Sequence, residues 1–323
     1  MNTTFGSELN HPTPILAPVG AIRRLDSRLN SLIPTDAHIE KLAGGFQFTE
    51  GPLWFSTGHL WFSDVIGNVV RQWSTEGVVT EILQNAGGHS NAPPGSFIGP
   101  NGMIADADGA VLLCQHTNRR IVRISRDRHI SPLIDKYDGK RLNSPNDLVY
   151  KSDGSLYFTD PPYGLVKQDE DPSKELSFNG VYRFADGKLQ VIIDDLTRPN
   201  GLAFSPDEQT LYVANSEPQK LWMRYDVQPD GTVSNGRVFF DVTSSAEKGL
   251  PDGMKLDARG NLYCAGPGGV WVFSPDGSHL GTIVTPETPA NCNWGDDGKT
   301  LYITAEMSLY RIRLAVEGKK ALY

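Results

Sequence analysis

The sequence predicts an all-β fold, a six-bladed β-propeller, and three observations predict it. A motif recurs six times at a period that suits one four-stranded blade. Each copy has a polar residue, a short apolar strand, a turn rich in Asp and Gly, and a second apolar strand. Gly and Pro, at 33 and 22 residues, are abundant and fall mostly in turns such as Asp153-Gly154.

The six copies share one register. The four clearest copies begin at Pro100, Pro145, Pro199 and Pro251, and two weaker ones begin at Thr49 and Ala290. In five copies the polar residue stands ten positions before the first apolar residue of the second strand. In the copy that begins at Pro199 the spacing is eleven positions. Six units at one register are hard to obtain by chance. The polar residues are Glu50, Asn101, Asn146, Asn200, Asp252 and Asn291.

Outer strands are expected between the repeats, but the sixth repeat is followed only by "SLYRIRLAV". We predict that "IEKLA", residues 39–43, supplies the missing outer strand and closes the ring, which removes the open edges. The propeller is therefore expected to span residues 39–323. Residues 1–38 would form an N-terminal extension, in which "VGAIRRLDSRLNSLI" has the apolar spacing of one amphipathic helix that caps the propeller.

The composition favours a small-molecule substrate. A net charge of -8 without a dense basic cluster disfavours nucleic acid or an anionic membrane as a partner. The polar N-terminus lacks the layout of a secretory signal, and no apolar run has transmembrane length, so a cytoplasmic location is predicted, as a monomer or homodimer. Cys114, Cys264 and Cys292 are widely spaced within apolar runs and are expected to be buried free thiols.

The inner strand of each blade lines the central channel, so the six polar residues are expected at one level near one mouth. Five of them precede a small residue that lets the backbones crowd the axis: Gly51, Gly102, Gly201, Gly253 and Cys292. The preference of turns for Asn-Gly and Asp-Gly would explain any single one of these dipeptides. It would not explain a glutamate at position 50. Two carboxylates desolvated together are unfavourable unless a cation compensates them.

The ring therefore predicts one bound divalent cation. Its candidate ligands offer oxygen only, which favours a hard ion: Ca²⁺ first, then Mg²⁺ or Mn²⁺, with Zn²⁺ or Fe²⁺ as alternatives. The second strand of each blade returns to the same face, so the loops that follow these strands should surround the mouth. His116 and Tyr163 lie in such loops and are candidates for substrate contact; for each, a purely structural bond to backbone is the equal alternative.

Five motifs resemble the gluconolactonase branch of the family that also includes regucalcin (senescence marker protein): "FTEGPLW", "KRLNSPNDLVY", "LYFTDPPYG", "LTRPNGLAFSPDEQTLYVANS" and "LPDGMKLD". The resemblance runs from about Arg24 to the C-terminus. It implies a six-bladed propeller with a divalent metal that supports opening of gluconolactone-type sugar lactones to aldonic acids.

The resemblance also implies site residues. The family's metal ligands fall on Glu50, Asn200 and Asp252, with Asn146 as a fourth ligand or a substrate contact, and Asn101 is expected to contact the substrate. Regucalcin-type members have an Arg two residues before the counterpart of Asn146. In this sequence that position is Ser144, and Arg141 is the nearby candidate to replace it.

For a lactone, the expected mechanism uses the metal as a Lewis acid on the ring carbonyl. Asp252 would act as the general base or as the ligand that orients the attacking water. The "GxSxG" motif of serine hydrolases is missing from the sequence. Two other functions stay open: a metal-dependent esterase or phosphotriesterase-type propeller hydrolase, and a calcium-binding propeller without catalysis.

Overall fold

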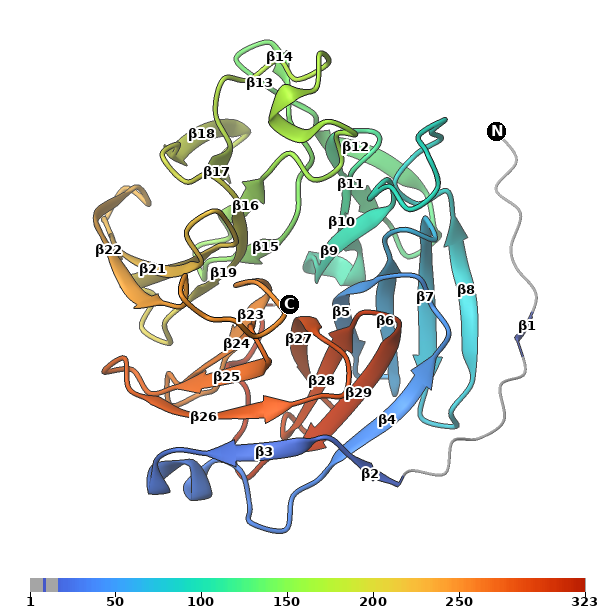
Figure 1. Ribbon diagram of the computed structural model, residues 1–323. Coiled ribbons are helices and arrows are strands. Elements are labelled where there is room, and N and C mark those ends of the chain that lie inside the picture. Colours follow the sequence, from blue (N-terminus) through green and yellow to red (C-terminus); the bar gives the residue numbers. More distant parts are fainter. Residues whose placement is uncertain (1–7, 10–16, 323) are drawn as a thin grey trace.

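The computed structural model describes residues 8–9 and 17–322. Six sheets of four or five antiparallel strands are arranged around a central axis, as Figure 1 shows, and each sheet is one blade of a propeller. The blades follow one another in chain order, and the first strand of each blade lies nearest the axis. The predicted all-β, six-bladed propeller is confirmed.

The first four blades each consist of four consecutive strands, ordered from the axis outwards. Blade one has β5 (Thr49–Phe55), β6 (His59–Asp64), β7 (Val69–Ser74) and β8 (Val79–Gln84), with β1 (Glu8–Leu9) beside β8. Blade two has β9 (Pro100–Ala105), β10 (Val111–Gln115), β11 (Arg120–Ile124) and β12 (Ile130–Ile134). Blade three has β15 (Leu148–Tyr150), β16 (Leu156–Asp160), β17 (Gly180–Ala185) and β18 (Lys188–Ile193). Blade four has β19 (Pro199–Phe204), β20 (Thr210–Asn215), β21 (Leu221–Val227) and β22 (Val233–Asp241).

Segments from the N-terminal part of the chain extend the last two blades. Blade five has β23 (Met254–Leu256), β24 (Leu262–Gly266), β25 (Gly269–Phe273), β26 (His279–Val284) and then β3 (Ala21–Arg24). Blade six has β27 (Pro289–Gly295), β28 (Thr300–Ala305), β29 (Ser308–Arg313), β4 (Ile39–Gly44) and then β2 (Pro18–Val19). The hairpin β13 (Lys136–Tyr137) and β14 (Lys140–Arg141) and the short 3-10 helices η2 (Ala107–Gly109) and η3 (Gln168–Glu170) lie in connections.

The ring closes as predicted, because β4 pairs antiparallel with β29 and supplies the fourth strand of blade six. In the register of this pair, Ile39 stands opposite Ile312. Blade six then packs directly against blade one: Trp54 of blade one stacks on Tyr302 of blade six, with ring centroids 5.1 Å apart. An outer strand from one end of the chain thus joins three strands from the other.

The predicted capping helix at residues 19–33 is wrong. This segment forms β3, which pairs with the outer edge of β26, and then only η1 (Ser27–Ser31), a short 3-10 helix. The free edge of β26 offers backbone partners that a helix could not use, and the Asp26 side chain accepts a hydrogen bond from the Arg28 amide, which favours a turn. The apolar residues are nevertheless buried, as the pattern indicated: Leu29 packs in the core between blades five and six.

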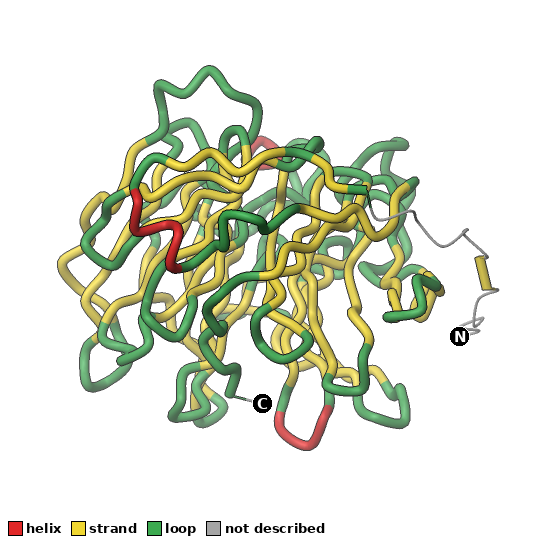
Figure 2. The backbone as a smooth tube through the Cα atoms, turned by 90° about the horizontal axis from the view of Figure 1, so that it is seen from below, coloured by secondary structure: helices red, strands yellow, loops and turns green. Residues whose placement is uncertain are grey.

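The core lies between the blades. Six clusters of buried apolar side chains fill the spaces between successive blades, including the space between the sixth and the first. The three cysteines are free and buried in this packing, as predicted. Viewed from the side, the strands cross between two faces, and the described C-terminal end lies at the middle of one of them (Figure 2).

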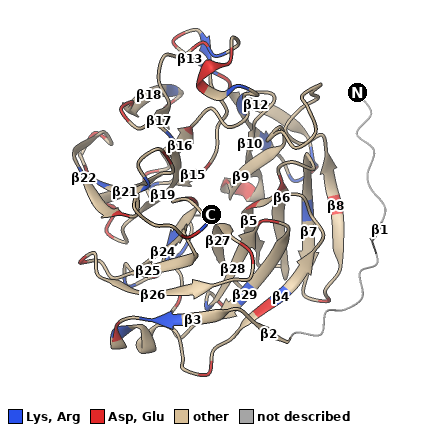
Figure 3. Cartoon of the chain, in the orientation of Figure 1, with Lys and Arg blue, Asp and Glu red and all other residues tan. Residues whose placement is uncertain are grey.

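Charged residues are interspersed over all blades in the described part of the chain (Figure 3). Many of them pair within a blade, as Arg71 does with Glu81 at 2.9 Å. Among the described residues, none of the helices has the length and apolarity needed to cross a membrane.

Candidate metal centre and active site

Six polar residues lie at or just before the start of the inner strands. Each blade contributes one of them: Glu50, Asn101, Asn146, Asn200, Asp252 and Asn291. Five are buried and Asp252 is partly accessible. Contacts join neighbours around the axis: the Gly102 amide donates to the Asn146 carbonyl at 2.8 Å, and Asn291 Nδ2 donates to Glu50 Oε2 at 3.0 Å. We call these six residues the ring.

The glycines that follow ring residues allow this crowding. A Cβ atom added to Gly102 would lie 2.5 Å from the carbonyl oxygen of Asn146, and one added to Gly201 would lie 2.4 Å from that of Asp252. Real Cβ atoms do not approach backbone so closely, so only glycine lets adjacent inner strands come this near to the axis.

Asn101 is oriented by a chain of hydrogen bonds. The buried His116 ring contacts the Phe97 carbonyl through Nδ1 at 3.0 Å and Asn101 Nδ2 through Nε2 at 3.2 Å. Burial lowers the pKa of His116 to about 4, so the ring is neutral at pH 7. A proton on Nδ1 satisfies both contacts, because Nδ1 then donates to the carbonyl and Nε2 accepts from the amide. Among the described residues, Asn101 Oδ1 is left without a partner.

Two further ring amides are oriented in the same way. Asn200 Nδ2 donates to Ser216 Oγ at 3.1 Å, and Ser216 Oγ in turn donates to the Pro251 carbonyl at 2.7 Å. Asn291 Oδ1 accepts from the Cys292 amide at 2.9 Å, which turns its Nδ2 towards Glu50. Asn200 therefore keeps its carbonyl oxygen for another ligand, whereas Asn291 acts as a donor that holds Glu50.

Several carboxylate and amide oxygens at the ring are available to a cation. Asn101 Oδ1 and Asp252 Oδ1 are buried and accept no hydrogen bond from the described residues. Both hydrogen bonds to Glu50, from Gly51 N and Asn291 Nδ2, go to Oε2. Unpaired buried acceptors are unfavourable, and hard divalent cations bind such oxygens. No group of three His, Cys, Asp or Glu side chains within the described ranges could hold a metal alone, so a cation here would also draw on amide oxygens.

The electrostatics of the ring also fit a cation. Burial raises the pKa of Glu50 to about 7, and hydrogen bonds from Gly51 and Asn291 only partly oppose this effect. Burial, followed by the negative charges of Glu50 and Asp147, raises the pKa of Asp252 well above its usual range. Without a cation these carboxyls hold protons that they would release in water, and a divalent cation would reverse this shift.

Asp147 is an acid at the ring that the sequence pattern alone did not single out. It is buried, its Oδ1 accepts from the Leu148 amide at 2.8 Å, and its Oδ2 has no donor among the described residues. Its charge acts on both Glu50 and Asp252. The signal was present, because Asp147 follows Asn146 at the position that is small after the other five ring residues.

Tyr163 lies beside the ring, and its hydroxyl is buried. Burial raises the pKa of Tyr163, the nearby Ser216 hydroxyl lowers it, and the charge of Asp252 raises it further. Ser144 lies under the same loop: its Oγ donates to the Pro161 carbonyl at 2.6 Å and accepts from the Gly164 amide at 2.8 Å. The loop is packed so closely here that a Cβ on Gly164 would lie 2.7 Å from Ser144 Cβ.

Arg141, the predicted replacement for the missing arginine, is exposed on the β13–β14 hairpin. Its Nη2 donates to the Asn118 carbonyl at 3.3 Å, and its amide donates to Glu175. These contacts tie Arg141 to surface loops, and the hydrogen bonds and ion pairs of the described residues do not connect its side chain to the ring.

Comparison with known proteins gives a consistent picture. A gluconolactonase of Zymomonas mobilis is 39% identical over 316 residues, which cover 93% of this chain and 88% of that protein. The solved structure of a gluconolactonase from Xanthomonas campestris superposes with a TM-score of 0.83 at 34% identity, covering 96% of this chain and all of that chain. A diisopropyl-fluorophosphatase of Loligo vulgaris is 27% identical over 68% of this chain and 74% of its own length. The SMP-30/gluconolactonase/LRE-like region matches residues 48–307, and the chain belongs to that family.

Proposed function

We propose that this protein opens gluconolactone-type sugar lactones to aldonic acids with the help of one divalent cation held by the ring. Its class, a lactone-hydrolysing carboxylic ester hydrolase, follows from the gluconolactonases that resemble it over nearly the whole chain. The observation that supports the proposed site is the convergence of two carboxyls of raised pKa, one buried and one partly accessible, with unpaired amide and carboxylate oxygens.

Glu50, Asn200 and Asp252 would hold the cation, with Asn146 as a fourth ligand or a substrate contact. Ca²⁺ is the leading candidate because every donor is an oxygen, and Mg²⁺, Mn²⁺, Zn²⁺ and Fe²⁺ are the alternatives. When bound, the cation supplies positive charge that polarises the lactone carbonyl.

The protein's own residues then orient the substrate and move the proton. Asp252 takes a proton from the attacking water, or orients that water, while the water oxygen forms a bond to the carbonyl carbon. The bond from that carbon to the ring oxygen breaks, and the proton passes to the departing oxygen, which becomes a hydroxyl.

The remaining predicted residues would bind the sugar. Asn101 Oδ1, which belongs to the ring and has no hydrogen-bond partner among the described residues, and the Tyr163 hydroxyl beside the ring suit the hydroxyls of a lactone. His116 would act through Asn101, because both of its ring nitrogens are already engaged. A contact of Arg141 with the substrate, the monomeric or dimeric state and the cytoplasmic location stay predictions.

A second function has an observation in its favour, since a diisopropyl-fluorophosphatase is among the relatives. A metal-dependent esterase or phosphotriesterase activity is therefore the alternative, and a calcium-binding propeller without catalysis is the third possibility.

A pH-indicator assay separates these functions. Gluconolactone, xylonolactone and a phosphotriester are each supplied with and without EDTA. Acid release from the lactones that EDTA removes supports the proposal; release from the phosphotriester alone supports the alternative, and no release supports the non-catalytic propeller. The Asp252→Ala variant should lose turnover, whereas Asp194→Ala, a change at an exposed acid of the surface, should not. A near-normal kcat for Asp252→Ala contradicts the role of this residue.

A further inference from the structure

A cavity of about 270 Å³ lies beside the ring, between residues 94–97 and the loop after β16. Phe97, Tyr163 and Gln168 are among its walls. One of these walls also connects to the ring: the Phe97 carbonyl contacts His116, which contacts the ring residue Asn101. The cavity therefore adjoins the place where the lactone carbonyl would lie.

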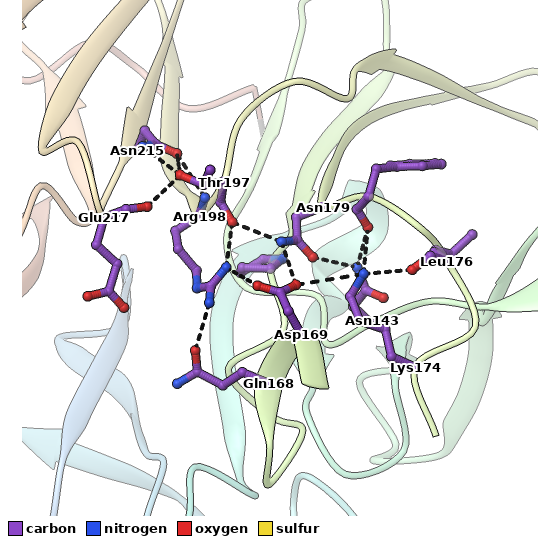
Figure 4. A network of polar contacts seen from close by, with 12 residues as sticks. Asn143, Gln168, Asp169, Lys174, Leu176, Asn179, Thr197, Arg198, Asn215 and Glu217 are labelled. Carbon is purple, nitrogen blue, oxygen red and sulfur yellow. Dashed lines mark hydrogen bonds and ion pairs between the residues drawn. The ribbon is translucent and has the colours of Figure 1, made fainter. Parts of the chain in front are cut away.

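The cavity has a hydrogen-bond donor that the described part of the protein does not use. It is the side-chain amide of Gln168, whose Oε1 accepts from Arg198 Nη2 at 3.1 Å. Since the oxygen is engaged by Arg198, the NH₂ group of Gln168 is turned away from it, as Figure 4 shows. Ser144 cannot serve in the same way, because its hydroxyl is already engaged by Pro161 and Gly164. The Tyr163 ring lines the cavity, but its hydroxyl is shielded from it.

A network of ion pairs and hydrogen bonds holds Gln168 in place (Figure 4). Arg198 Nη1 pairs with Asp169 Oδ2 and donates to the Thr197 carbonyl at 2.8 Å. Asp169 Oδ1 accepts from Asn179 Nδ2 at 3.0 Å, and Asn179 Nδ2 also donates to the Thr197 carbonyl at 2.8 Å. The segment of η3 is thereby fixed to the strand that carries the ring residue Asn200.

The backbone of Gln168 supports a functional role for this position. Its φ is +47°, a left-handed conformation that is unfavourable for a residue with a side chain. The Arg198 and Asp169 contacts on either side maintain this conformation, which sets the direction of the Gln168 side chain at the cavity wall.

The contents of the cavity follow from its size and chemistry. At roughly 30 Å³ per water molecule, its volume is ample for a hydroxymethyl group. A hexono-1,5-lactone carries this hydroxylated side chain on the far side of the ring oxygen that leaves, and the hydroxyl oxygen of the side chain can accept from the NH₂ group of Gln168.

Building on the proposed function, we infer that this cavity binds the hydroxylated side chain of a hexonolactone and that Gln168 is a specificity-determining residue. Arg198 and Asp169 are positioning residues that act through Gln168.

The Gln168→Glu variant tests this inference. A glutamate still accepts from Arg198, and so retains the network, but its carboxylate cannot donate to the substrate. The exposed Gln190 provides the matched control, Gln190→Glu. Glucono-1,5-lactone and xylono-1,5-lactone, which differ only by the hydroxymethyl side chain, are compared as substrates. The corresponding non-hydrolysable lactams are compared by calorimetric titration, which reports binding independently of turnover.

The expected result is a loss of about three- to tenfold in kcat/KM for gluconolactone, mainly through KM, with a matching loss of gluconolactam affinity. Xylonolactone and its lactam should change less than about twofold, since they lack the partner group. Asp169→Asn should show the same selective loss, and Gln190→Glu none. Equal losses for both sugars, no loss, or no binding of gluconolactam by the unmodified protein would overturn the inference. Absence of lactone hydrolysis alongside selective lactam binding would instead overturn the proposed function.

Discussion

Replacing Glu50 with Gln is expected to stabilise the ion-free protein at alkaline pH even though it removes a proposed ligand. Burial raises the pKa of Glu50 from 4.5 to about 7 in the folded protein. The folded state therefore binds a proton that the unfolded state has lost. This contribution to stability is fully present below pH 4.5 and is lost as the pH rises through 7.

The size of the effect follows from the shift. A rise of about 2.5 pKa units at roughly 1.4 kcal/mol per unit makes the ionised, ion-free site about 3 kcal/mol less stable at pH 8.5 than the protonated one. A glutamine amide at position 50 cannot ionise and avoids this loss. The Glu50→Gln variant should thus unfold about 4 °C higher than the unmodified protein at pH 8.5, and the two should converge near pH 4.5.

Scanning calorimetry in EDTA at both pH values measures this difference, with Glu317→Gln, a change at an exposed acid, as the control. Adding Ca²⁺ at pH 8.5 should raise the unfolding temperature of the unmodified protein and leave that of Glu50→Gln nearly unchanged, because only the former keeps both carboxylates. A stability difference that does not depend on pH, or a variant that is less stable at both values, would refute the reasoning.

Two other changes test the surroundings of the ring. Burial lowers the pKa of His116 from 6.5 to about 4, so its contribution to stability is present above pH 6.5 and is lost as the pH falls through 4. Urea unfolding should show that His116→Gln depends less on pH in this window, and an unchanged pH profile would count against a buried neutral imidazole. Gly102→Ala should cost about 1–3 kcal/mol and reduce activity, because its Cβ would meet the Asn146 carbonyl at 2.5 Å. Gly139→Ala has open space around it, but its φ of +76° strains an alanine there, so this control should lose stability through the backbone alone and retain full activity. Equal activity in the two variants would show that the close approach at Gly102 is not needed.

The sequence was most informative where a repeated pattern reports a repeated structure. The polar residue, the turn and the second strand recur in each blade, so one register predicted the position of all six ring residues. Residues 39–43 could be assigned to the outer edge of blade six because a closed ring leaves no other partner for β29.

Features that depend on contacts between distant segments were harder to predict. Residues 21–24 have helical apolar spacing but pair with β26. The stabilisation that they gain from the backbone groups at the edge of β26 depends on a segment far away in the sequence, so the local sequence does not indicate it. Gln168 and Arg198 belong to different blades, and only Arg198 lies in one of the quoted motifs, so their contact emerges only from the fold. Asp147 was partly predictable. It interrupts the pattern of small residues that follow the ring residues, but only the structure shows that its charge raises the pKa of Glu50 and of Asp252.

The closure of blade six also sets the order of events during synthesis. Arg311 of β29 pairs with Glu40 of β4 across 271 residues of chain. At roughly 5–20 residues per second, β4 leaves the ribosome about 15–50 s before its partner strand exists. During that interval its edge is exposed, and Asn291, which holds Glu50, has not been made. The ring can therefore form only after nearly the whole chain has been translated, so a nascent chain interrupted before blade six would lack a complete ring and would carry an unpaired strand.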